Sequence, residues 1–589
     1  MSLRSSLSAL VGEAFASLGL EPSLGEVVVS QRPELSQFQT NGALRAAKAA
    51  KREPRELAEE VATALRAHPR VLSQVAVEGP GFINLTLTDE YLAAELNRSI
   101  SDPRLGVPKV EQPRSILVDF GGPNVAKSMH VGHLRSALIG DALVRIARFL
   151  GHRVEGDIHL GDWGTQIGQL ILELERRQPS LPYFAPDQEG PFPTESPVTV
   201  DDLSEMYPAA AARAASDPTE AERARAATLE LQHGRPGYRA LWQHFVETSN
   251  QAQRQDFDGL GVQFDHWFGE STVNHRLEPL IQRMRKAGVL TESEGALIVD
   301  VSQATDSHPV PPLLLRKSDG AYLYATTDLA TIEQRVDELG ADTLLYVVDA
   351  RQGLHFEQVF RAARLGGIAP PQIELTHLGF GTVNGPDGKP FKTRAGGVPL
   401  LSDLIQGVTD AAHRRIGEAE LARGYSETER EEIARLVGLA ALKFGDLSNH
   451  RTSNYIFDPD RFVSFEGKTG PYLLYAAVRI QSILGKAAQL GLAAGPLLPP
   501  GVAAERRLML ELTELPEVIQ RAAEGWAPNH LCEFAYRLAT EFNRFYDTCH
   551  ILRETDPARQ ASWLQLASLT MAELRLILGL LGIEIPQRM

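Results

Sequence analysis

The stretch Pro123-Asn124-Val125-Ala126-Lys127-Ser128-Met129-His130-Val131-Gly132-His133-Leu134-Arg135-Ser136 decides how the middle of this chain folds. Residues 115–120 before it are apolar and bounded by proline and glycine, which predicts a short buried strand. Apolar residues after it recur at helical spacing as far as Phe149, and Gly151 stands where the helix would end. A second strand is expected near residues 153–158. This strand–loop–helix–strand order is typical of a parallel sheet, so we predict an α/β fold.

Four polar side chains gather in the loop between that strand and the helix, namely Asn124, Lys127, His130 and His133. The loop is expected at the carboxyl end of the strand, where open parallel sheets bind ligands. The two histidines share a face of the first helical turn, where free N–H groups and the helix dipole favour an anion such as phosphate. Gly132 between them lets a flat base or a backbone approach closely. The alternative is a helix start whose histidines only cap the helix and contact solvent.

Length and composition indicate a soluble protein of several domains. The chain has 589 residues, of which 43% are hydrophobic and 23% are charged. No apolar run reaches the roughly 18 residues of a membrane span, and the first residues predict an amphipathic helix rather than a signal peptide. Its two cysteines, Cys532 and Cys549, are too few for a disulfide scaffold or a cysteine-rich zinc site and fit a reducing cytoplasm. Because the net charge is −16, any nucleic acid must bind to local basic faces.

Residues 1–110 have the pattern of a separate module with helices and strands. Phe82 and Asn84 lie two residues apart in a predicted strand at 82–87, so both face the same side of it. One interpretation is a ring that stacks on an unstacked base beside an amide that reads its edge. The other is a core ring beside a polar edge residue.

Further candidate binding residues lie at two other places. Tyr324 and Asp328 stand four residues apart at an expected helix start and share a face, although an ordinary solvated aspartate gives the same pattern. Gln352 lies in the loop after a predicted buried strand at 344–348, again at a carboxyl end. These positions extend the predicted ligand site along the edge of the sheet.

Two other segments stand apart from the sheet. Residues near 178–235 are rich in Pro, Glu, Asp and Ala and are predicted to be an insertion with helical parts. Residues 384–397 form a long glycine-rich loop whose cations include Lys392 and Arg394, which suits a closing phosphate clamp. The alternative for this loop is a solvated hairpin tip.

The chain from about residue 401 onward is predicted to be a helix bundle, because its segments are amphipathic with helical period. Tyr472, Tyr475 and Arg479 would share one helix face there, a pattern suited to stacking on bases. A plain core stripe accounts for the same spacing.

Taken together, these stretches resemble the arginyl-tRNA synthetases, a family of class I aminoacyl-tRNA synthetases, along essentially the whole chain. The residues that carry the resemblance are 123–127, 130–136, 159–168, 324–328, 352–355, 391–394, 442–451 and 574–589. The resemblance implies a Rossmann-type catalytic domain over 111–400, an α+β module at 1–110 that contacts the tRNA elbow, and an all-α anticodon-binding domain at 401–589. It also implies ATP-dependent ligation of L-arginine to its cognate tRNA through an arginyl-adenylate, with release of AMP and pyrophosphate.

Roles for individual residues follow from the same resemblance. The guanidinium of arginine is a planar, permanently charged five-donor fork, so its pocket should offer carboxylates and aligned acceptors. The residues implied for arginine are Asp119, Tyr324 and Asp328 at the guanidinium, and Asn124 and Gln352 at the α-amino and carboxylate end. Those implied for ATP and catalysis are Lys127, His130, Gly132, His133, Lys392 and Arg394. Those implied for tRNA are Phe82 and Asn84 at the elbow, and Tyr472, Tyr475 and Arg479 at the anticodon.

The chain departs from the family pattern at two places. Many relatives have hydroxyl residues where this chain has Gly121 and Gly122, so one contact to the α-amino group is missing or made through water. Thr393 replaces the second lysine of the lysine-rich loop, the one that usually meets the phosphates. We expect Lys127, three residues before His130, to supply that charge.

The remaining expectations concern cofactors, partners and rival assignments. ATP is expected as its Mg²⁺ complex without a protein-bound metal site, and the chain is expected to be a cytoplasmic monomer. Another class I synthetase or a nucleotidyltransferase would share the two histidines, but those nucleotidyltransferases are usually far shorter and lack the C-terminal bundle. A non-catalytic tRNA-binding relative would be expected to lose His130 or His133, and both are present.

Overall fold

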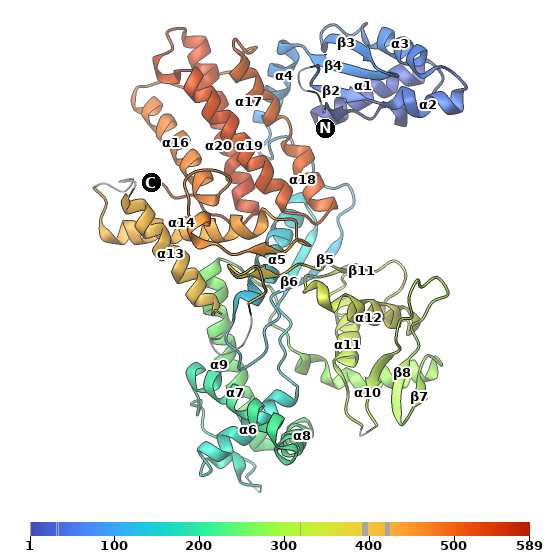
Figure 1. The fold of residues 1–589 in the computed structure, drawn as a ribbon, viewed down its shortest axis with the longest axis vertical. Helices are drawn as coiled ribbons and strands as arrows, with labels where there is room; N and C mark the ends of the chain where they lie inside the picture. Colours follow the sequence, from blue (N-terminus) through green and yellow to red (C-terminus); the bar gives the residue numbers. More distant parts are fainter. Residues whose placement is uncertain are drawn as a thin grey trace. The chain divides into compact units, whose positions relative to one another are not determined.

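The computed structural model describes residues 2–30, 32, 35–186, 188–318, 320–391, 399–418 and 424–589. They form two compact units (Figure 1). The first comprises Met1–Val110, Glu420–Leu436 and Ser464–Met589, and the second comprises Glu111–Ala419 and Val437–Val463. We predicted boundaries at residues 110 and 400, whereas residues 401–418 and 437–463 belong to the second unit, which contains the parallel sheet.

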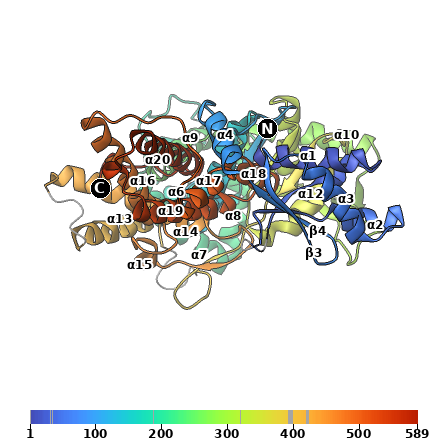
Figure 2. The ribbon, with the colours of Figure 1, turned by 90° about the horizontal axis from the view of Figure 1, so that it is seen from above.

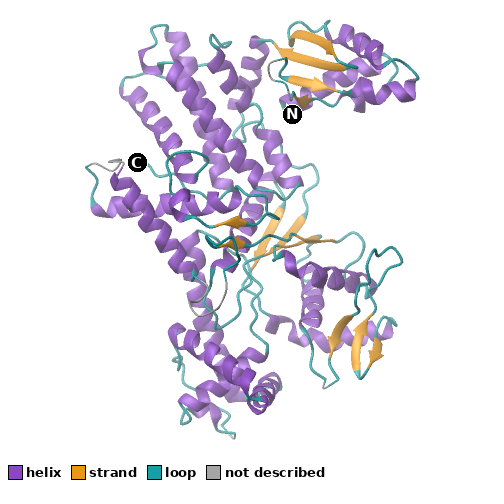
Figure 3. Ribbon diagram, in the orientation of Figure 1, coloured by secondary structure: helices purple, strands orange, loops and turns teal. Residues whose placement is uncertain are grey.

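A four-stranded parallel sheet with the strand order β11-β10-β5-β6 is the centre of the second unit (Figure 3). Its strands are β5 (Ser115–Asp119), β6 (Arg153–Asp157), β10 (Thr343–Tyr346) and β11 (Glu374–His377). The helices that connect or precede them are α5 (Val131–Leu150), α11 (Tyr324–Asp337) and α12 (Gly353–Leu365), with the short turn η4 (Ala350–Gln352) before α12. The predicted α/β class is confirmed, and so are the strands expected near 115–120, 153–158 and 344–348.

Helix α5 follows β5 and carries the two histidines at its start. His130 is its N-cap, and the imidazole Nδ1 atoms of His130 and His133 accept the N–H groups of Gly132 and His130 at 3.0 and 3.1 Å. Gly151 ends the helix with a φ of 98°, a left-handed conformation that glycine adopts without strain. Most of α5 is buried, which agrees with its apolar periodicity.

The predicted insertion forms a helical layer of its own. It contains η2 (Pro182–Phe184), α7 (Val200–Ser216) and α8 (Pro218–Gln232), which pack with α6 (Thr165–Arg177) and α9 (Pro236–Leu260) around one apolar core. From the sequence we also predict a strand at 264–267, which is wrong, because His266 makes only an isolated parallel bridge to Asp157. The chain continues through η3 (Glu270–Arg276), α10 (Leu277–Lys286) and an antiparallel sheet of β7 (Thr291–Ser293), β8 (Ala296–Val299) and β9 (Leu313–Arg316).

A buried ion pair joins α5 to the later part of the second unit. Arg135 Nε lies 3.1 Å from Asp446 Oδ2, and both side chains are almost fully buried. Arg135 also donates to the carbonyls of Gly381 and Ser453 at 2.9 and 2.7 Å. The elements around them are β12 (Val383–Asn384), β13 (Tyr455–Ile456), α13 (Leu401–Glu418), α15 (Pro459–Phe462) and the end of α14 (Glu427–Leu447). Residues 437–463 therefore complete the interior behind the histidine helix.

The first unit contains the N-terminal module and most C-terminal helices. The module is an antiparallel sheet in the order β1-β2-β4-β3, made of β1 (Val28–Val29), β2 (Phe38–Thr40), β3 (Leu72–Glu78) and β4 (Phe82–Leu87). Its helices are α1 (Leu3–Ser17), η1 (Pro22–Gly25), α2 (Gly42–Ala50), α3 (Pro54–Leu65) and α4 (Asp89–Ile100). The bundle consists of α16 (Gly470–Gln489), α17 (Ala503–Leu512), α18 (Leu515–Glu524), α19 (Asn529–Thr548), η5 (Ile551–Arg553) and α20 (Pro557–Leu580) (Figure 2).

Helix α20 is long and apolar enough, by length and composition alone, to cross a membrane. In the structure 67% of its most apolar window is buried, and it packs against α16 and α19. A core helix of a bundle has this composition because it is covered on several sides.

Candidate active site

The paired histidines are the most clearly built part of the site. Their rings lie 4.1 Å apart, and burial lowers the pKa of His133 to about 3 and also lowers the pKa of His130. Both are therefore neutral near pH 7. Because each Nδ1 accepts a backbone N–H, the proton of each neutral ring is on Nε2, which can donate to an anion.

The loop before the histidines packs against the loop that follows β6. Val125 N–H donates to the carbonyl of Gly161 at 3.0 Å, and a Cβ atom built on Gly161 would lie 2.0 Å from Asn124 Oδ1, so any side chain there would displace the Asn124 amide. A Cβ atom on Gly164 would lie 3.4 Å from the Tyr324 hydroxyl. The loop at 161–164 thus lies between Asn124 and Tyr324, and it brings these two predicted arginine ligands to one end of the sheet.

Lys127 lies in the same loop but contacts the insertion. Its ammonium lies 4.8 Å from the centre of the Tyr207 ring on α7. Lys392 and Arg394, the other predicted phosphate-binding cations, and Thr393 lie outside the described residues.

Asp119 at the end of β5 is paired with a guanidinium of the protein itself. Arg335 on α11 is buried and places Nη2 2.6 Å from Asp119 Oδ2 and 2.6 Å from Asp157 Oδ2. Burial is the main cause that raises the pKa of Asp119, and Arg335 opposes it. Sequence reasoning missed Arg335, although its seven-residue spacing from Asp328 puts both on one face of α11.

Three carboxylates interact electrostatically near Tyr324, namely Glu270 with Asp162 and Asp328. Burial, and after it the charges of Asp162 and Asp328, raise the pKa of Glu270 to about 8. Glu270 also raises the pKa of Tyr324, after the larger effect of burial. Repulsion among these carboxylates would be relieved by a cation. Glu270 was missed because it follows an irregular segment and has no motif of its own.

Asp328 has a titratable partner on α12. His355 Nε2 lies 2.6 Å from Asp328 Oδ2, and this hydrogen bond raises the pKa of His355. Gln352, three residues earlier, is exposed at the N-cap of the same helix. The predicted placement of Tyr324 and Asp328 on one helix start is confirmed, because both lie in the first turns of α11.

The predicted tRNA contacts lie in the first unit. Phe82 is partly exposed on β4, whereas Asn84 is 4% exposed and its Oδ1 accepts Gln39 Nε2 at 2.8 Å. An amide that is buried and already bonded to a neighbouring strand is less available to a base than the ring of Phe82.

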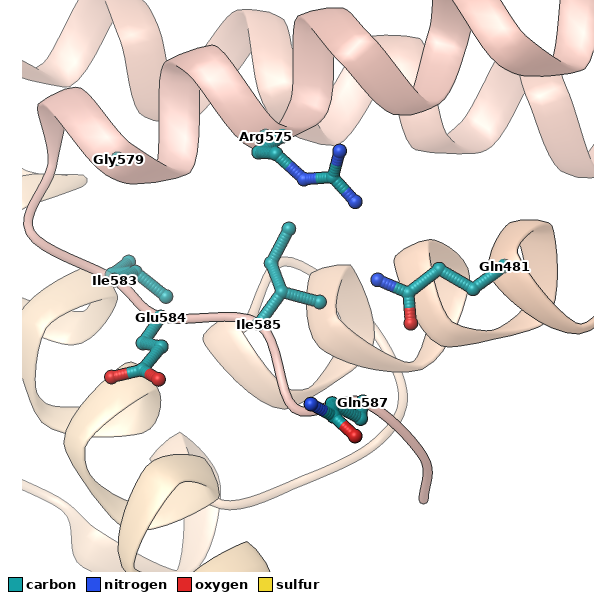
Figure 4. Close-up of a pocket in the computed structure, with 7 residues that line it drawn as sticks. All are labelled: Gln481, Arg575, Gly579, Ile583, Glu584, Ile585 and Gln587. Atoms are coloured by element: carbon teal, nitrogen blue, oxygen red, sulfur yellow. The ribbon is translucent and has the colours of Figure 1, made fainter.

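Tyr472, Tyr475 and Arg479 share a half-buried face of α16, as predicted. Arg479 donates to the Tyr475 hydroxyl at 3.2 Å and to Asn543 Oδ1 at 3.1 Å, and Asn543 donates to the Tyr472 hydroxyl at 2.9 Å. Asn543 on α19 was missed by sequence reasoning. Elsewhere in this unit, a cavity of about 510 Å³ is lined from α16, α20 and the C-terminal segment, with Gln481 and Arg575 extending into it (Figure 4).

Three family models match the chain, and the first defines the class of the parallel-sheet unit. It is described as tRNA synthetases class I (R), catalytic domain, and matches residues 95–459. An arginyl tRNA synthetase N terminal domain matches residues 2–87, and a DALR anticodon binding domain matches residues 473–589. The chain belongs to the arginyl-tRNA synthetase family of class I.

Curated relatives and solved structures agree with this assignment. The chain is 47% identical to an arginine–tRNA ligase of Alkaliphilus oremlandii, covering 99% of each chain, and 50% identical to one of Maricaulis maris, covering 100% of each. Its fold is similar to the arginyl-tRNA synthetase structures of Plasmodium falciparum and Thermus thermophilus. The former has a TM-score of 0.82 and 23% identity, covering 100% of this chain and 99% of that one. The latter has a TM-score of 0.80 and 22% identity, covering 100% of both.

Proposed function

We propose that this chain ligates L-arginine to its cognate tRNA with ATP, through an arginyl-adenylate, releasing AMP and pyrophosphate. The observation that carries the proposal is the neutral histidine pair at the N-terminus of α5, at the same sheet edge as the carboxylates around Tyr324. The histidine pair suits an anionic triphosphate, and the carboxylates suit a cationic side chain.

The histidine pair serves the phosphates of ATP. His130 and His133 donate from Nε2, and Gly132 keeps the helix N-terminus open to the nucleotide. As charge develops on the phosphates during adenylate formation, these fixed donors stabilise the transition state more than the ground state. Lys127, Lys392 and Arg394 supply positive charge, with Lys127 replacing the lysine absent at Thr393.

The substrate is ATP with its Mg²⁺ ion. Among the described residues, no group of three or more His, Cys, Asp or Glu side chains is placed to hold a metal ion. We propose that the ion enters and leaves with the nucleotide.

The carboxylates select arginine. Asp328 and Glu270 face the guanidinium, and the Tyr324 hydroxyl accepts one of its N–H groups. Asp119 contributes through its second oxygen, Oδ1, because Oδ2 is held by Arg335. Asn124 and Gln352 hold the α-amino and carboxylate end. Lysine has a single compact ammonium and would leave part of this acceptor set unused.

The first unit binds tRNA. Phe82 stacks on a base of the elbow beside the buried Asn84, and Tyr472, Tyr475 and Arg479 meet the anticodon by stacking and hydrogen bonding. We propose a monomer that works in the cytoplasm.

A charging assay with each of the twenty amino acids, with and without total tRNA, tests the function. We expect arginine to be attached to tRNA in an ATP-dependent reaction, with no charging of lysine. Charging of a different amino acid in preference to arginine would refute the assignment, and tRNA binding without any charging would favour a non-catalytic relative.

A further inference from the structure

One residue of the histidine loop has a backbone conformation that its side chain disfavours. Ala126 has a φ of 62°, in the left-handed region that glycine occupies freely and alanine avoids. It is the third residue of a turn in which Lys127 N–H approaches the Asn124 carbonyl at 3.4 Å. A turn with positive φ at this position ordinarily carries glycine or asparagine. Something other than the local sequence therefore holds the loop.

Helix α9 supplies that support through two buried side chains. The Ser249 hydroxyl accepts Ala126 N–H at 2.9 Å and donates to the Phe245 carbonyl at 2.7 Å. Gln253, one helical turn later, donates from Nε2 to the Asn124 carbonyl at 3.1 Å. Ser249 is 5% exposed and Gln253 is 2% exposed, and the hydrogen bond from Ala126 to Ser249 is buried. A buried N–H group that loses such an acceptor pays the full cost of desolvation.

The opposite side of the loop contacts α7. The Ser128 and Ser204 hydroxyls lie 2.8 Å apart, and Lys127 lies over the Tyr207 ring. The Val125 N–H group bonds to the Gly161 carbonyl, whereas the Asn124 carbonyl and the Ala126 N–H group bond to side chains of α9. Ser249 and Gln253 therefore support the side of the turn that carries the strained residue.

We propose that Ser249 and Gln253 are positioning residues that hold the strained turn at Ala126 and thereby aim Asn124 at arginine. This inference rests on the proposed function for the role of Asn124. Neither side chain needs to touch a substrate. Their effect is to keep a turn in the one conformation that presents Asn124 beside Gly161.

Steady-state kinetics with a rescue variant test the proposal. In Ser249→Ala, KM for arginine should rise about tenfold, while KM for tRNA stays within twofold of wild type. In the double variant with Ala126→Gly, KM for arginine should be at least threefold lower than in Ser249→Ala alone, because glycine adopts the left-handed conformation without support. Gln253→Met, which keeps the size but removes the donor, should also raise KM for arginine.

The matched control is Thr248→Ala, which removes a hydroxyl from the neighbouring position on α9, where Thr248 donates to Ser196 at an exposed site. It should behave as wild type. An unchanged KM for arginine in folded Ser249→Ala, or a double variant no better than Ser249→Ala alone, would overturn the positioning role.

Amide hydrogen exchange over residues 123–129 gives a readout that does not depend on activity. In the absence of substrates, the backbone amide hydrogens of this segment should exchange at least tenfold faster in Ser249→Ala than in wild type. In Thr248→Ala their exchange rates should be unchanged. Wild-type protection in Ser249→Ala would refute the inference even if the enzyme charges arginine. Faster exchange in a protein that charges no arginine would support the structural role and refute the proposed function instead.

Discussion

Arg335 Nη2 lies 2.6 Å from Asp119 Oδ2, so a carboxylate expected to bind the guanidinium of a substrate already binds one from the protein. The same nitrogen lies 2.6 Å from Asp157, and the three side chains form a buried cluster with one cation and two carboxylates. This cluster fixes the ends of β5 and β6 to α11, the helix that carries Tyr324 and Asp328.

Removing Arg335 should therefore destabilise the sheet unit. Arg335→Met would leave two buried carboxylates without a cation, a change that typically costs about 3–5 kcal/mol. We expect a fall of several degrees in the melting temperature. The control is Arg351→Met, because the Arg351 side chain is 78% exposed in its pair with Asp349 and such pairs contribute less than about 1 kcal/mol. Equal melting temperatures for both variants would contradict the stabilising role.

Loss of either histidine should lower the rate of adenylate formation more than it weakens substrate binding. We expect His130→Ala and His133→Ala each to lower kcat by raising the activation free energy about 2–4 kcal/mol, because the Nε2 donors act on charge that develops in the transition state. Pyrophosphate exchange measures this step. Because the pKa of His133 is about 3, its contribution should be constant between pH 6 and pH 8. A normal kcat in a folded His133→Ala protein would remove the role.

Neutralising the carboxylates should affect arginine more than ATP. Asp328→Asn keeps the side-chain size but removes a charge that faces the substrate fork, so KM for arginine should rise at least tenfold. Glu270→Gln should have this effect only above pH 8, where the Glu270 carboxyl, with its pKa of about 8, is ionised. KM for ATP should change less than threefold. Equal changes in both constants would indicate that these residues only support the fold.

The pair of His355 and Asp328 predicts a pH dependence of arginine binding. Asp328 raises the pKa of His355 above its usual 6.5, so the protonated pair contributes stability below pH 6.5 and loses it as pH rises through the raised pKa. Deprotonation of His355 frees the charge of Asp328 for the substrate, and KM for arginine should fall. Ionisation of Glu270, whose pKa is about 8, should lower KM again at higher pH.

His355→Gln separates the two steps in that profile. The variant should lose the step at lower pH and keep the one near pH 8. A profile identical to wild type would show that His355 does not control Asp328.

Phe82 should contribute to tRNA binding and not to the chemistry. Loss of one base stack costs about 1–3 kcal/mol, so Phe82→Ala should raise KM for tRNA and leave KM for arginine and ATP unchanged. Binding should weaken with added salt, because an acidic chain must contact phosphates through local basic surfaces. A large fall in melting temperature with a normal KM for tRNA would instead identify Phe82 as a core residue.

The sequence was sufficient for those parts of the site that depend on local pattern. The strand β5, the helix α5 and the shared face of Tyr324 and Asp328 follow from periodicity, caps and four-residue spacing. Glu270 has no local signal, and the spacing of Arg335 from Asp328 places it on the right helix face without showing its partners, because Asp119 and Asp157 lie on distant strands. The same holds for Ser249, whose partner Ala126 lies 123 positions earlier in the chain.

The buried pair of Arg135 and Asp446 has a consequence for how this protein can be made. More than three hundred positions separate these two residues, so the ribosome releases the partner of Arg135 only long after the histidine helix has emerged. A fragment that stops at residue 400 contains the whole parallel sheet but has a guanidinium in its interior with no carboxylate. We expect such a fragment to be recovered as aggregate, and a recombinant catalytic piece to need residues 437–463 supplied in the same chain or as a second polypeptide.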